Sequence, residues 1–450
     1  MIDLLETERA QAFLNQKVPA IIAGQIDVHA LSVLAATARP SLYVHYALDL
    51  VDRLSGQRRK QLLTIERFAG ADLDSAAFRL EQQIEKLPPK DTDLTKFVAK
   101  DLDRELLIYP FPLDAKLYCL PLAADPQASL EKLRVDCPEL VDGFPGSHAS
   151  VHVLRYVPGR RCQLRYVLGR DDSTSLTFLG KIFRGDRGQQ AFDLLEKVAR
   201  FYTSSGDGQF FAPKPLAYLS DWKMVIQEHI DGATLNQMVR TGLAGNRQFS
   251  AAAGCIARLH NSKIEVNRYH GIGDELEILE KSLAGVDEAG LSDHSFSLTL
   301  DKIQEFAVGL TPSRFVTVHR DFYDKQLIMD GQRTALIDLD TLSMGCPEID
   351  VANFLAHLDL RYLQRGTERH RSVEWRDAFL AEYRVHGKPL NSVLVTFFTA
   401  TTYFRLACRY RLISRGEALA RTLLRLADLQ VNRNLDAEWV HVASGKAVIL

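Results

Sequence analysis

The sequence predicts an α+β fold in which a β-rich lobe is followed by a helical lobe, with a cleft between them. Between residues 150 and 230, segments rich in β-branched and aromatic residues are separated by turn residues. After residue 230, apolar residues recur at helical spacing as far as residue 429. A polar, strand-like segment at 315–342 interrupts this helical part. Chains with this order of elements fold as layers that leave a cleft for ligands.

We place the β-rich lobe at residues 146–230 and expect five strands and one helix in it. Pro158-Gly159 separates the first two strands, as is typical of a hairpin turn. A third strand precedes the helix, in which Leu195 and Val198 follow helical spacing. The expected strands are 151–157, 162–168, 176–183, 215–219 and 224–229, and the expected helix is 187–202. This order predicts a small, mostly antiparallel sheet with one helix on it.

The helical lobe is expected at residues 231–450. Its predicted helices are 251–260, 300–308, 349–358, 375–384, 392–411 and 418–429. The densest group of polar residues in the chain lies between the second and the third of these helices. The cleft-facing chemistry is therefore expected in this lobe.

Residues 1–145 form an extra N-terminal α/β region with two open interpretations. Strands are expected at 43–51, 61–68 and 104–110, and a helix at 73–87. At one constant offset, Asp72 falls on Asp186, Arg67 on Lys181, and Ala77-Phe78 on Ala191-Phe192. The region is either an unrelated capping domain or a degenerate copy of the β-rich lobe.

Composition excludes several classes of protein. The 450 residues are 46% hydrophobic and 25% charged, and their formal net charge is −2. A charge so close to zero gives no reason to expect a nucleic-acid partner. The six cysteines form no C-x-x-C pair, which argues against a zinc site or a disulfide framework and fits a reducing compartment.

No membrane partner is expected either. The first residues are acidic and amphipathic, unlike a secretory signal peptide. The longest apolar segments, 30–38 and 393–404, are too short or too polar to span a bilayer. We therefore expect a soluble, cytoplasmic protein; its oligomeric state is left open.

The segment 315–358 carries the chemistry. A predicted strand ends in His319-Arg320-Asp321, Gln326 follows five residues after Asp321, and a short hairpin carries Asp338 and Asp340. Carboxylate and amide oxygens suit Mg²⁺, which takes one or two carboxylates together with substrate phosphates. A further aspartate at the same place can orient a hydroxyl nucleophile or accept its proton.

The spacing of these residues resembles the H-x-D-x-x-x-x-N catalytic loop and the I-D-F metal hairpin of kinase-like phosphotransferases. A later G-x-P-x-x-D-x-x-x-F segment is similar to that of aminoglycoside phosphotransferases and their relatives, such as maltokinases and choline or fructosamine kinases. In this chain it consists of Gly345, Pro347, Asp350 and Phe354. The resemblance covers roughly residues 150–430 and implies a bilobal, protein-kinase-like fold that binds ATP or GTP and Mg²⁺.

The resemblance also implies roles for single residues. Asp321 is implied to be the catalytic base, Asp338 the principal Mg²⁺ ligand, and Asp350 a structural acid that ties the catalytic loop to the helical lobe. His319 is expected to bond backbone rather than to react. Gln326 stands where the family has asparagine, as in maltokinase-like members, and is still expected to bind the metal.

Asp340 has two interpretations. It stands two residues after Asp338, on the same face if the hairpin is regular. It is either a ligand of a second metal ion or a solvated acid in a turn.

The β-rich lobe is expected to supply the nucleotide site. Lys181 lies in an apolar strand, where an unpaired charge is costly. Glu196 on the next helix is its expected partner, similar to the strand-lysine and helix-glutamate pair of kinases. The first hairpin lacks a glycine-rich loop, so Arg160 and Arg161 either contact phosphate in its place or are solvated, as arginines at hairpin tips more often are. By resemblance, the segment from Gln227 through His229 to Ile230 meets the nucleotide base.

The acceptor is expected over the catalytic loop, between late helices. Candidate wall residues are Trp375, Tyr383, Phe397, Tyr403 and Arg405, although aromatic residues at these spacings are more often core. The sequence shows no acidic pocket for a polycationic aminoglycoside. The cluster of Arg405, Arg409 and Arg411 favours a neutral or anionic acceptor instead.

The function predicted from the sequence is a small-molecule kinase that transfers the terminal phosphate of ATP or GTP to a hydroxyl group. Two alternatives remain open: a nucleotide-binding pseudokinase that regulates a partner, and a nucleotidyl transferase on the same fold. A protein kinase is disfavoured, because Asp338 to Pro347 leaves little room for an activation segment.

Overall fold

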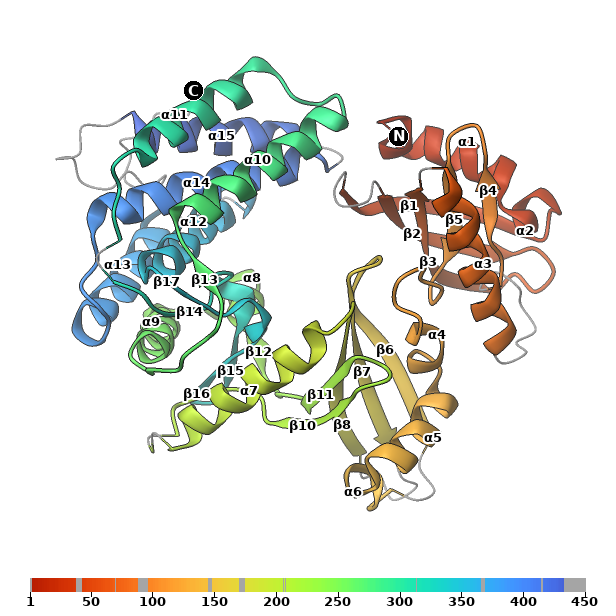
Figure 1. Ribbon diagram of the computed structural model, residues 1–450, viewed down its shortest axis with the longest axis horizontal. Helices are drawn as coiled ribbons and strands as arrows, with labels where there is room; N and C mark the ends of the chain where they lie inside the picture. Colours follow the sequence, from red (N-terminus) through yellow and green to blue (C-terminus); the bar gives the residue numbers. More distant parts are fainter. Residues whose placement is uncertain are drawn as a thin grey trace.

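The computed structural model describes residues 2–37, 43–68, 70–87, 96–144, 148–169, 175–204, 206, 208–312, 314–365, 369–413 and 416–432. Figure 1 shows the first domain in red to orange, the β-rich lobe in yellow and the helical lobe in green to blue. The β-rich lobe is joined to both other parts. The α+β, two-lobed architecture predicted from the sequence is confirmed, with the extra N-terminal region beside it.

All five strands and the helix predicted for the β-rich lobe are present. They are β6 (His148–Val157), β7 (Arg161–Gly169), β8 (Ser175–Phe183), α7 (Arg187–Ser204), β10 (Pro215–Leu219) and β11 (Met224–Glu228). The strands form an antiparallel sheet in the order β10-β11-β8-β7-β6. Tyr166 and Phe178 stack on one face of this sheet, with ring centroids 5.1 Å apart.

The same face is covered by three helices that precede the sheet in the sequence. These are α4 (Leu120–Ala123), α5 (Pro126–Asp136) and α6 (Pro138–Val141). Leu120, Leu130 and Leu133 share one buried cluster with Leu164 and Phe178. The core of the β-rich lobe therefore includes residues before the predicted boundary at 145.

Helix α7 connects the β-rich lobe to the helical lobe. Its Leu195 and Val198 are buried in the same cluster as Val225 of β11 and Leu339 of the helical lobe. One hydrophobic core therefore spans both lobes here and packs the sheet against the catalytic segment.

The first domain has its own five-stranded antiparallel sheet. Its elements are η1 (Ile2–Leu5), α1 (Thr7–Lys17), α2 (Pro19–Ile22), β1 (Ile26–Thr37), β2 (Tyr43–Asp52), β3 (Arg58–Arg67), α3 (Ala71–Lys86), β4 (Ala99–Asp101) and β5 (Leu106–Pro110). The strand order is β1-β2-β3-β5-β4, with α3 between the third and fourth strands. This is the same order as in the second sheet.

The predicted elements of the first domain correspond to β2, β3, α3 and β5, whereas β1 and α1 were not predicted. Strand β1 has two register shifts, between Val28 and Ala30 and between Val33 and Ala35. Such bulges break the alternation of apolar and polar residues on which strand prediction depends.

The helical lobe contains every helix predicted for it. Its helices are α8 (Leu235–Thr241), α9 (Asn246–His260), α10 (Ile272–Glu288), α11 (His294–Ala307), α12 (Glu348–Arg365), α13 (Arg369–His386), α14 (Ser392–Arg411) and α15 (Glu417–Val431). Helices α8 and α10 were not predicted. In α10, Gly273 and Gly285 and the buried Glu275 weaken the helical signal of the apolar residues.

Short strands and single turns carry the polar segment of this lobe. They are β9 (Phe210–Phe211), β12 (Ala233–Thr234), β13 (Tyr269–His270), β14 (Val316–Val318), η3 (Asp324–Gln326), β15 (Leu327–Asp330), β16 (Arg333–Leu336), η4 (Leu339–Thr341) and β17 (Ser343–Gly345). Strands β15 and β16 form a hairpin, and Asp338 and Asp340, which were predicted to lie in it, follow its second strand. Among the helices that the structure describes, none has the length and apolar character needed to cross a membrane.

Candidate active site

The catalytic loop follows β14 and is held by one buried carboxylate. Asp350, in the first turn of α12, accepts hydrogen bonds from the backbone N–H groups of His319 and Arg320, both at 2.7 Å. His260 places Nε2 3.0 Å from the same carboxylate. Arg320 has a φ of 70°, a conformation that side chains disfavour, so these charge-assisted bonds hold a strained turn. Asp350 thus ties the loop to the helical lobe, as the resemblance implied.

His319 contacts backbone, as expected. It is fully buried, and its Nε2 lies 2.9 Å from the carbonyl oxygen of Ile337, at the end of the β15–β16 hairpin. The ring therefore holds the catalytic loop against the metal hairpin.

Two carboxylates after this hairpin face the lysine of the β-rich lobe. Lys181 places Nζ 2.5 Å from Oδ1 of Asp338 and 2.7 Å from Oδ1 of Asp340. Asp338 has a φ of 61°, which turns the chain sharply after β16. Lys181 is only 6% exposed, so its charge is stabilised by these two partners and not by water.

Gln326 lies between the catalytic loop and the metal hairpin. Its Nε2 is 3.3 Å from Oδ2 of Asp321 and 3.5 Å from Oδ2 of Asp338. The structure therefore brings Asp321, Gln326, Asp338, Asp340 and Lys181 into one cluster. The first four residues lie within the short segment 321–340, and Lys181 comes from strand β8 of the other lobe.

The pKa values in this cluster follow from burial and neighbouring charges. Burial favours the neutral acid of Asp338, but the charges of Lys181 and Arg161 outweigh it and lower the pKa of that carboxyl. Burial also opposes the charged form of Lys181, and the two aspartates reverse this and raise its pKa. Burial, followed by the charge of Asp338, raises the pKa of Asp321. Asp321 thus differs from Asp338 in how readily it takes a proton.

The donor set fits a divalent cation with hard oxygen ligands. The ammonium of Lys181 lies between Asp338 and Asp340, which shows that this position stabilises positive charge. Gln326 would present its oxygen after a half-turn of its amide, since amide orientations are assigned from their surroundings. The described residues contain no group of three or more His, Cys, Asp and Glu side chains placed to hold a metal. Mg²⁺ commonly takes one or two carboxylates and completes its shell with water and phosphate oxygens.

A narrow cavity lies beside Lys181. It is lined by Lys181, Asp338, Asp340, Gln227 and apolar residues. Gln227 is 9% exposed and lies on β11. His229 follows β11, is partly exposed, and places Nε2 3.6 Å from Asp231; it is not among the described residues that line this cavity.

Arginines from the first hairpin reach the carboxylates of Asp338 and Asp340. Arg161 is 3.2 Å from Oδ2 of Asp340 and 3.6 Å from Oδ1 of Asp338, and Arg155 is 3.7 Å from Oδ2 of Asp338. Arg155, Arg160 and Arg161 also line a cavity of about 570 Å³ together with Arg187, Arg268 and Asp340. This concentration of guanidinium groups is suited to phosphate oxygens.

The turn of this hairpin is fixed by a carboxylate from the linker after the first domain. Asp114 accepts hydrogen bonds from the N–H of Gly159 and the hydroxyl of Tyr156, both at 2.8 Å. The same carboxylate also accepts from the backbone N–H groups of Lys116 and Leu117. Gly159 has a φ of 67°, as a glycine in a tight turn often does. The first domain is therefore linked directly to the loop that carries the arginines.

One predicted contact is wrong. Glu196 does not reach Lys181; it is 51% exposed and forms an ion pair with Arg200 at 3.2 Å. Helix α7 buries Leu195 and Val198, and this rotation places Glu196 on the outer face. Asp338 and Asp340 serve as the counter-charges of Lys181 instead.

Sequence reasoning missed three residues of the site. Arg155 contacts Asp338, and Arg268 donates a hydrogen bond to the carbonyl oxygen of Asp340 at 3.2 Å. Asp114 holds the hairpin turn. The cluster of arginines around Pro158-Gly159 was a signal for Arg155, whereas no local pattern marks Asp114 or Arg268.

The aromatic candidates for the acceptor wall are core residues. Trp375 is stacked on Phe249, with ring centroids 4.8 Å apart. Tyr383, Phe397 and Tyr403 are fully buried. They stabilise the helical lobe and do not line a cleft.

Comparison with known proteins finds a matching family. A family model described as "APH: Phosphotransferase enzyme family" matches residues 130–390. No curated protein matches the chain.

Several solved structures have a similar fold at low identity. An amicoumacin kinase in complex with AMP-PNP, Ca²⁺ and Ami is 13% identical, with a TM-score of 0.46 over 67% of this chain and 96% of that one. A spectinomycin phosphotransferase in complex with ADP and spectinomycin is 10% identical, with a TM-score of 0.47 over 68% and 97%. A choline kinase from Streptococcus pneumoniae is 14% identical, with a TM-score of 0.43 over 67% and 99%.

Proposed function

Because the chain belongs to the phosphotransferase enzyme family, we propose that it is a small-molecule kinase that moves the terminal phosphate of ATP or GTP to a hydroxyl group. The observation that supports this most strongly is the contact of Lys181 with Asp338 and Asp340 beside Asp321. Phosphoryl transfer depends on positioning and on neutralising phosphate charge. In this cluster Asp321 can position the acceptor hydroxyl. Lys181 and the metal ligands can serve to neutralise the phosphate charge.

In the proposed reaction, Asp321 accepts a hydrogen bond from the acceptor hydroxyl and aims its oxygen at the terminal phosphorus. The new oxygen–phosphorus bond forms as the bond from that phosphorus to the bridging oxygen breaks. The hydroxyl proton passes to Asp321, and the nucleoside diphosphate leaves. The raised pKa of Asp321, caused first by burial and then by Asp338, is consistent with this acceptance of a proton.

The donor phosphates are proposed to be held from the β-rich lobe. Lys181 exchanges Asp338 and Asp340 for phosphate oxygens, and Arg155, Arg160 and Arg161 bind further oxygens from the hairpin. A Mg²⁺ ion on Asp338, Gln326 and Asp340 would neutralise the charge that develops on the phosphates. The nucleotide base is proposed to lie against the segment from Gln227 to His229.

Within the region 1–145, helices α4 to α6 belong to the core of the β-rich lobe, and we propose that the five-stranded domain before them acts as a capping domain. Strand β1 contributes residues 34–36 to a cavity whose opposite side is formed by helices α10 and α14 of the helical lobe. The first domain also contacts the arginine-bearing hairpin through Asp114. Through β1 this domain can enclose the acceptor, and through Asp114 it holds the β6–β7 hairpin that is proposed to bind the donor phosphates.

The test is to incubate the full chain with Mg²⁺, ATP or GTP, and a pooled metabolite extract, and to search for new species by mass spectrometry. The expected product is heavier than its precursor by one phosphate and is lost when EDTA removes the metal. An adduct heavier by a nucleoside monophosphate would replace the proposal with a nucleotidyl transferase. Nucleotide binding with no product from any extract would favour a regulatory pseudokinase.

A further inference from the structure

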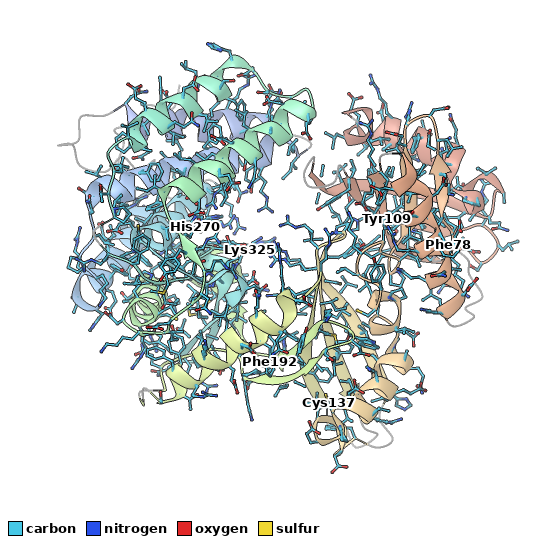
Figure 2. All side chains as sticks on the ribbon, in the orientation of Figure 1. Phe78, Tyr109, Cys137, Phe192, His270 and Lys325 are labelled. Carbon is cyan, nitrogen blue, oxygen red and sulfur yellow. The ribbon has the colours of Figure 1, made fainter. Side chains whose placement is uncertain are left out.

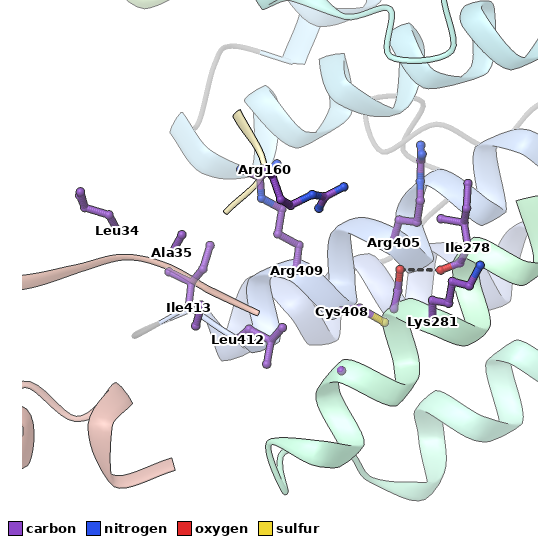
Figure 3. A pocket seen from close by; sticks show the side chains of 13 residues that line it. Leu34, Ala35, Arg160, Ile278, Lys281, Arg405, Cys408, Arg409, Leu412 and Ile413 are labelled. Carbon is purple, nitrogen blue, oxygen red and sulfur yellow. Dashed lines mark hydrogen bonds between the residues drawn. The ribbon is translucent and has the colours of Figure 1, made fainter. Parts of the chain in front are cut away.

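A cavity of about 630 Å³ lies where the three parts of the molecule meet. Figure 3 shows α10 and α14 on one side, with the end of β1 and the tip of the β6–β7 hairpin opposite them. Arg160, Lys281, Arg405 and Arg409 line it, and no carboxylate is among its described lining residues. Leu34, Leu412 and Ile413 line it as well and make part of its wall apolar.

The cavity adjoins the catalytic loop. Arg405 donates a hydrogen bond to Oδ1 of Asn353 at 3.0 Å, and Nδ2 of Asn353 donates to the carbonyl oxygen of Phe322 at 2.9 Å. Phe322 is the residue directly after Asp321. This chain of contacts places Arg405 one side chain away from the backbone of the proposed catalytic loop.

The charge of Arg409 also reaches this loop. Burial and the charge of Asp321 raise the pKa of Tyr323 to about 12, and Arg155 and Arg409 oppose that rise. Burial, followed by the charge of Arg361, lowers the pKa of Lys325, and Arg409 adds to this effect. Figure 2 shows Lys325 on the inner side of the helical lobe.

The cations of the cavity differ in how far they are neutralised. Lys281 pairs with Glu277 on the surface, and Nε of Arg405 lies 3.6 Å from the buried Glu275. In the described part of the chain, Arg160 and Arg409 have no carboxylate partner within ion-pair distance. Two guanidinium groups without counter-charges on one cavity favour an anionic ligand.

We propose that this cavity binds the anionic group of the acceptor, so that the acceptor is an alcohol that also carries a phosphate or a carboxylate. Arg409 and Arg405 from α14 and Arg160 from the hairpin hold the anionic oxygens. The apolar residues of α14 and β1 pack against the carbon skeleton. This assignment rests on the proposed function, since it takes the cavity to be the acceptor site.

Binding of small anions tests the cavity independently of turnover. The full chain is saturated with AMP-PNP and Mg²⁺, so that the donor site is filled, and is titrated with inorganic phosphate or acetate by calorimetry. Phosphate or acetate is expected to bind at one saturable site, and Arg409→Gln to weaken that binding about tenfold. Arg411→Gln is the matched control, because Arg411 lies on the same helix but bonds the carbonyl oxygen of Leu291 and Glu417.

An Arg411→Gln protein that binds like wild type, beside a weakened Arg409→Gln protein, supports the assignment. Absence of a saturable site, or equal binding by both variants and wild type, overturns it. The same assay with glycerol 3-phosphate, glycerate and glycerol compares a phosphate, a carboxylate and an uncharged alcohol on similar carbon skeletons. The two anions are expected to bind and glycerol is not. Tighter binding of glycerol than of either anion would also overturn the assignment.

The two proposals fail in different ways. If neither AMP-PNP nor its guanine analogue GMP-PNP binds, the proposed kinase function fails, and the effect of Arg409→Gln on phosphate binding still decides the cavity. If phosphate is transferred to a neutral or cationic alcohol at the same rate by wild type and Arg409→Gln, the kinase function stands and the anionic acceptor is wrong.

Discussion

The two five-stranded sheets of this protein have the same strand order but different polar chemistry. Both place a helix between the third and fourth strands, and in both the fifth strand pairs with the third. In the first sheet, the buried Glu66 binds Lys116 at 2.7 Å and the hydroxyl of Tyr109 at 2.6 Å. In the second sheet, the buried Lys181 binds Asp338 and Asp340 of another lobe.

This difference shows that strand order alone does not make a site. The charge in the first sheet is neutralised by the domain itself and the linker after it. The charge in the second sheet is neutralised by carboxylates of another lobe, and in the proposed function a metal ion takes these carboxylates while phosphate oxygens take the lysine. Arg67, which the sequence offset aligned with Lys181, lies at the exposed end of β3 and pairs with Glu105. We propose that the first sheet is a degenerate copy of the second sheet. It has the same strand order, but it has no counterpart of the contact between Lys181 and the carboxylates of the helical lobe.

The largest expected effect comes from replacing Lys181, and the control is the same replacement of the aligned residue Arg67. Lys181→Ala should lower kcat/KM by about 10²-fold or more, because it removes a buried cation from the donor phosphates. Arg67→Ala should leave kcat/KM unchanged. Steady-state kinetics of both variants with the identified acceptor measures this, and equal losses in the two would remove the distinction between the sheets.

An intermediate effect is expected where the first domain touches the second sheet. Asp114→Ala leaves the N–H of Gly159 and the hydroxyl of Tyr156 without their acceptor, and should cost about 3 kcal/mol of unfolding free energy. It should also raise the KM for nucleotide, since the arginine-bearing turn is released. Thermal and urea unfolding measure the first change, and donor kinetics the second.

The control for Asp114 is Asp52, an exposed carboxylate in the first sheet that also accepts backbone N–H groups in a turn. Asp52→Ala should lower Tm much less and leave the KM for nucleotide at its wild-type value. A KM that rises equally in both variants would mean that the linker does not act through the hairpin.

The smallest effect is expected for Glu196. Because this residue lies on the outer face of α7 and pairs with Arg200, Glu196→Gln should change kcat/KM by less than about twofold. A loss of tenfold or more would mean that the helix rotates in the nucleotide-bound enzyme and brings Glu196 to Lys181, as the sequence had suggested. Kinetics at saturating acceptor with varied nucleotide decide between the two.

The fold was predicted best where local signals were strong. The bounds predicted for α14, 392–411, match the structure, because Asn391 caps the backbone N–H groups of Val393 and Leu394 and apolar residues follow. Strands β6 to β8 were found from their β-branched residues and the Pro158-Gly159 turn. Strand β1 was missed because its bulges interrupt the alternation of its side chains.

The site was predicted where it depends on sequence spacing and missed where it depends on distant contacts. Asp321, Gln326 and Asp338 lie within one short segment, and the structure brings them together. Asp114 is 45 residues from Gly159, so no spacing rule relates them. The partner of Lys181 was assigned to the wrong residue. The spacing of apolar residues predicts helix α7, but it did not tell us which side of this helix faces Lys181.

The central claim is that one site, between the second sheet and the helical lobe, transfers phosphate with Asp321 as its base. The most direct test follows transfer of radiolabelled terminal phosphate from ATP or GTP to the acceptor, at saturating donor, by wild type, Asp321→Asn and Asp330→Asn. Asp330 is an exposed acid of the same hairpin that pairs with Arg333. The account predicts that Asp330→Asn is as fast as wild type and that Asp321→Asn is slower by about 10²-fold or more. An Asp321→Asn protein that transfers phosphate at the wild-type rate would contradict it.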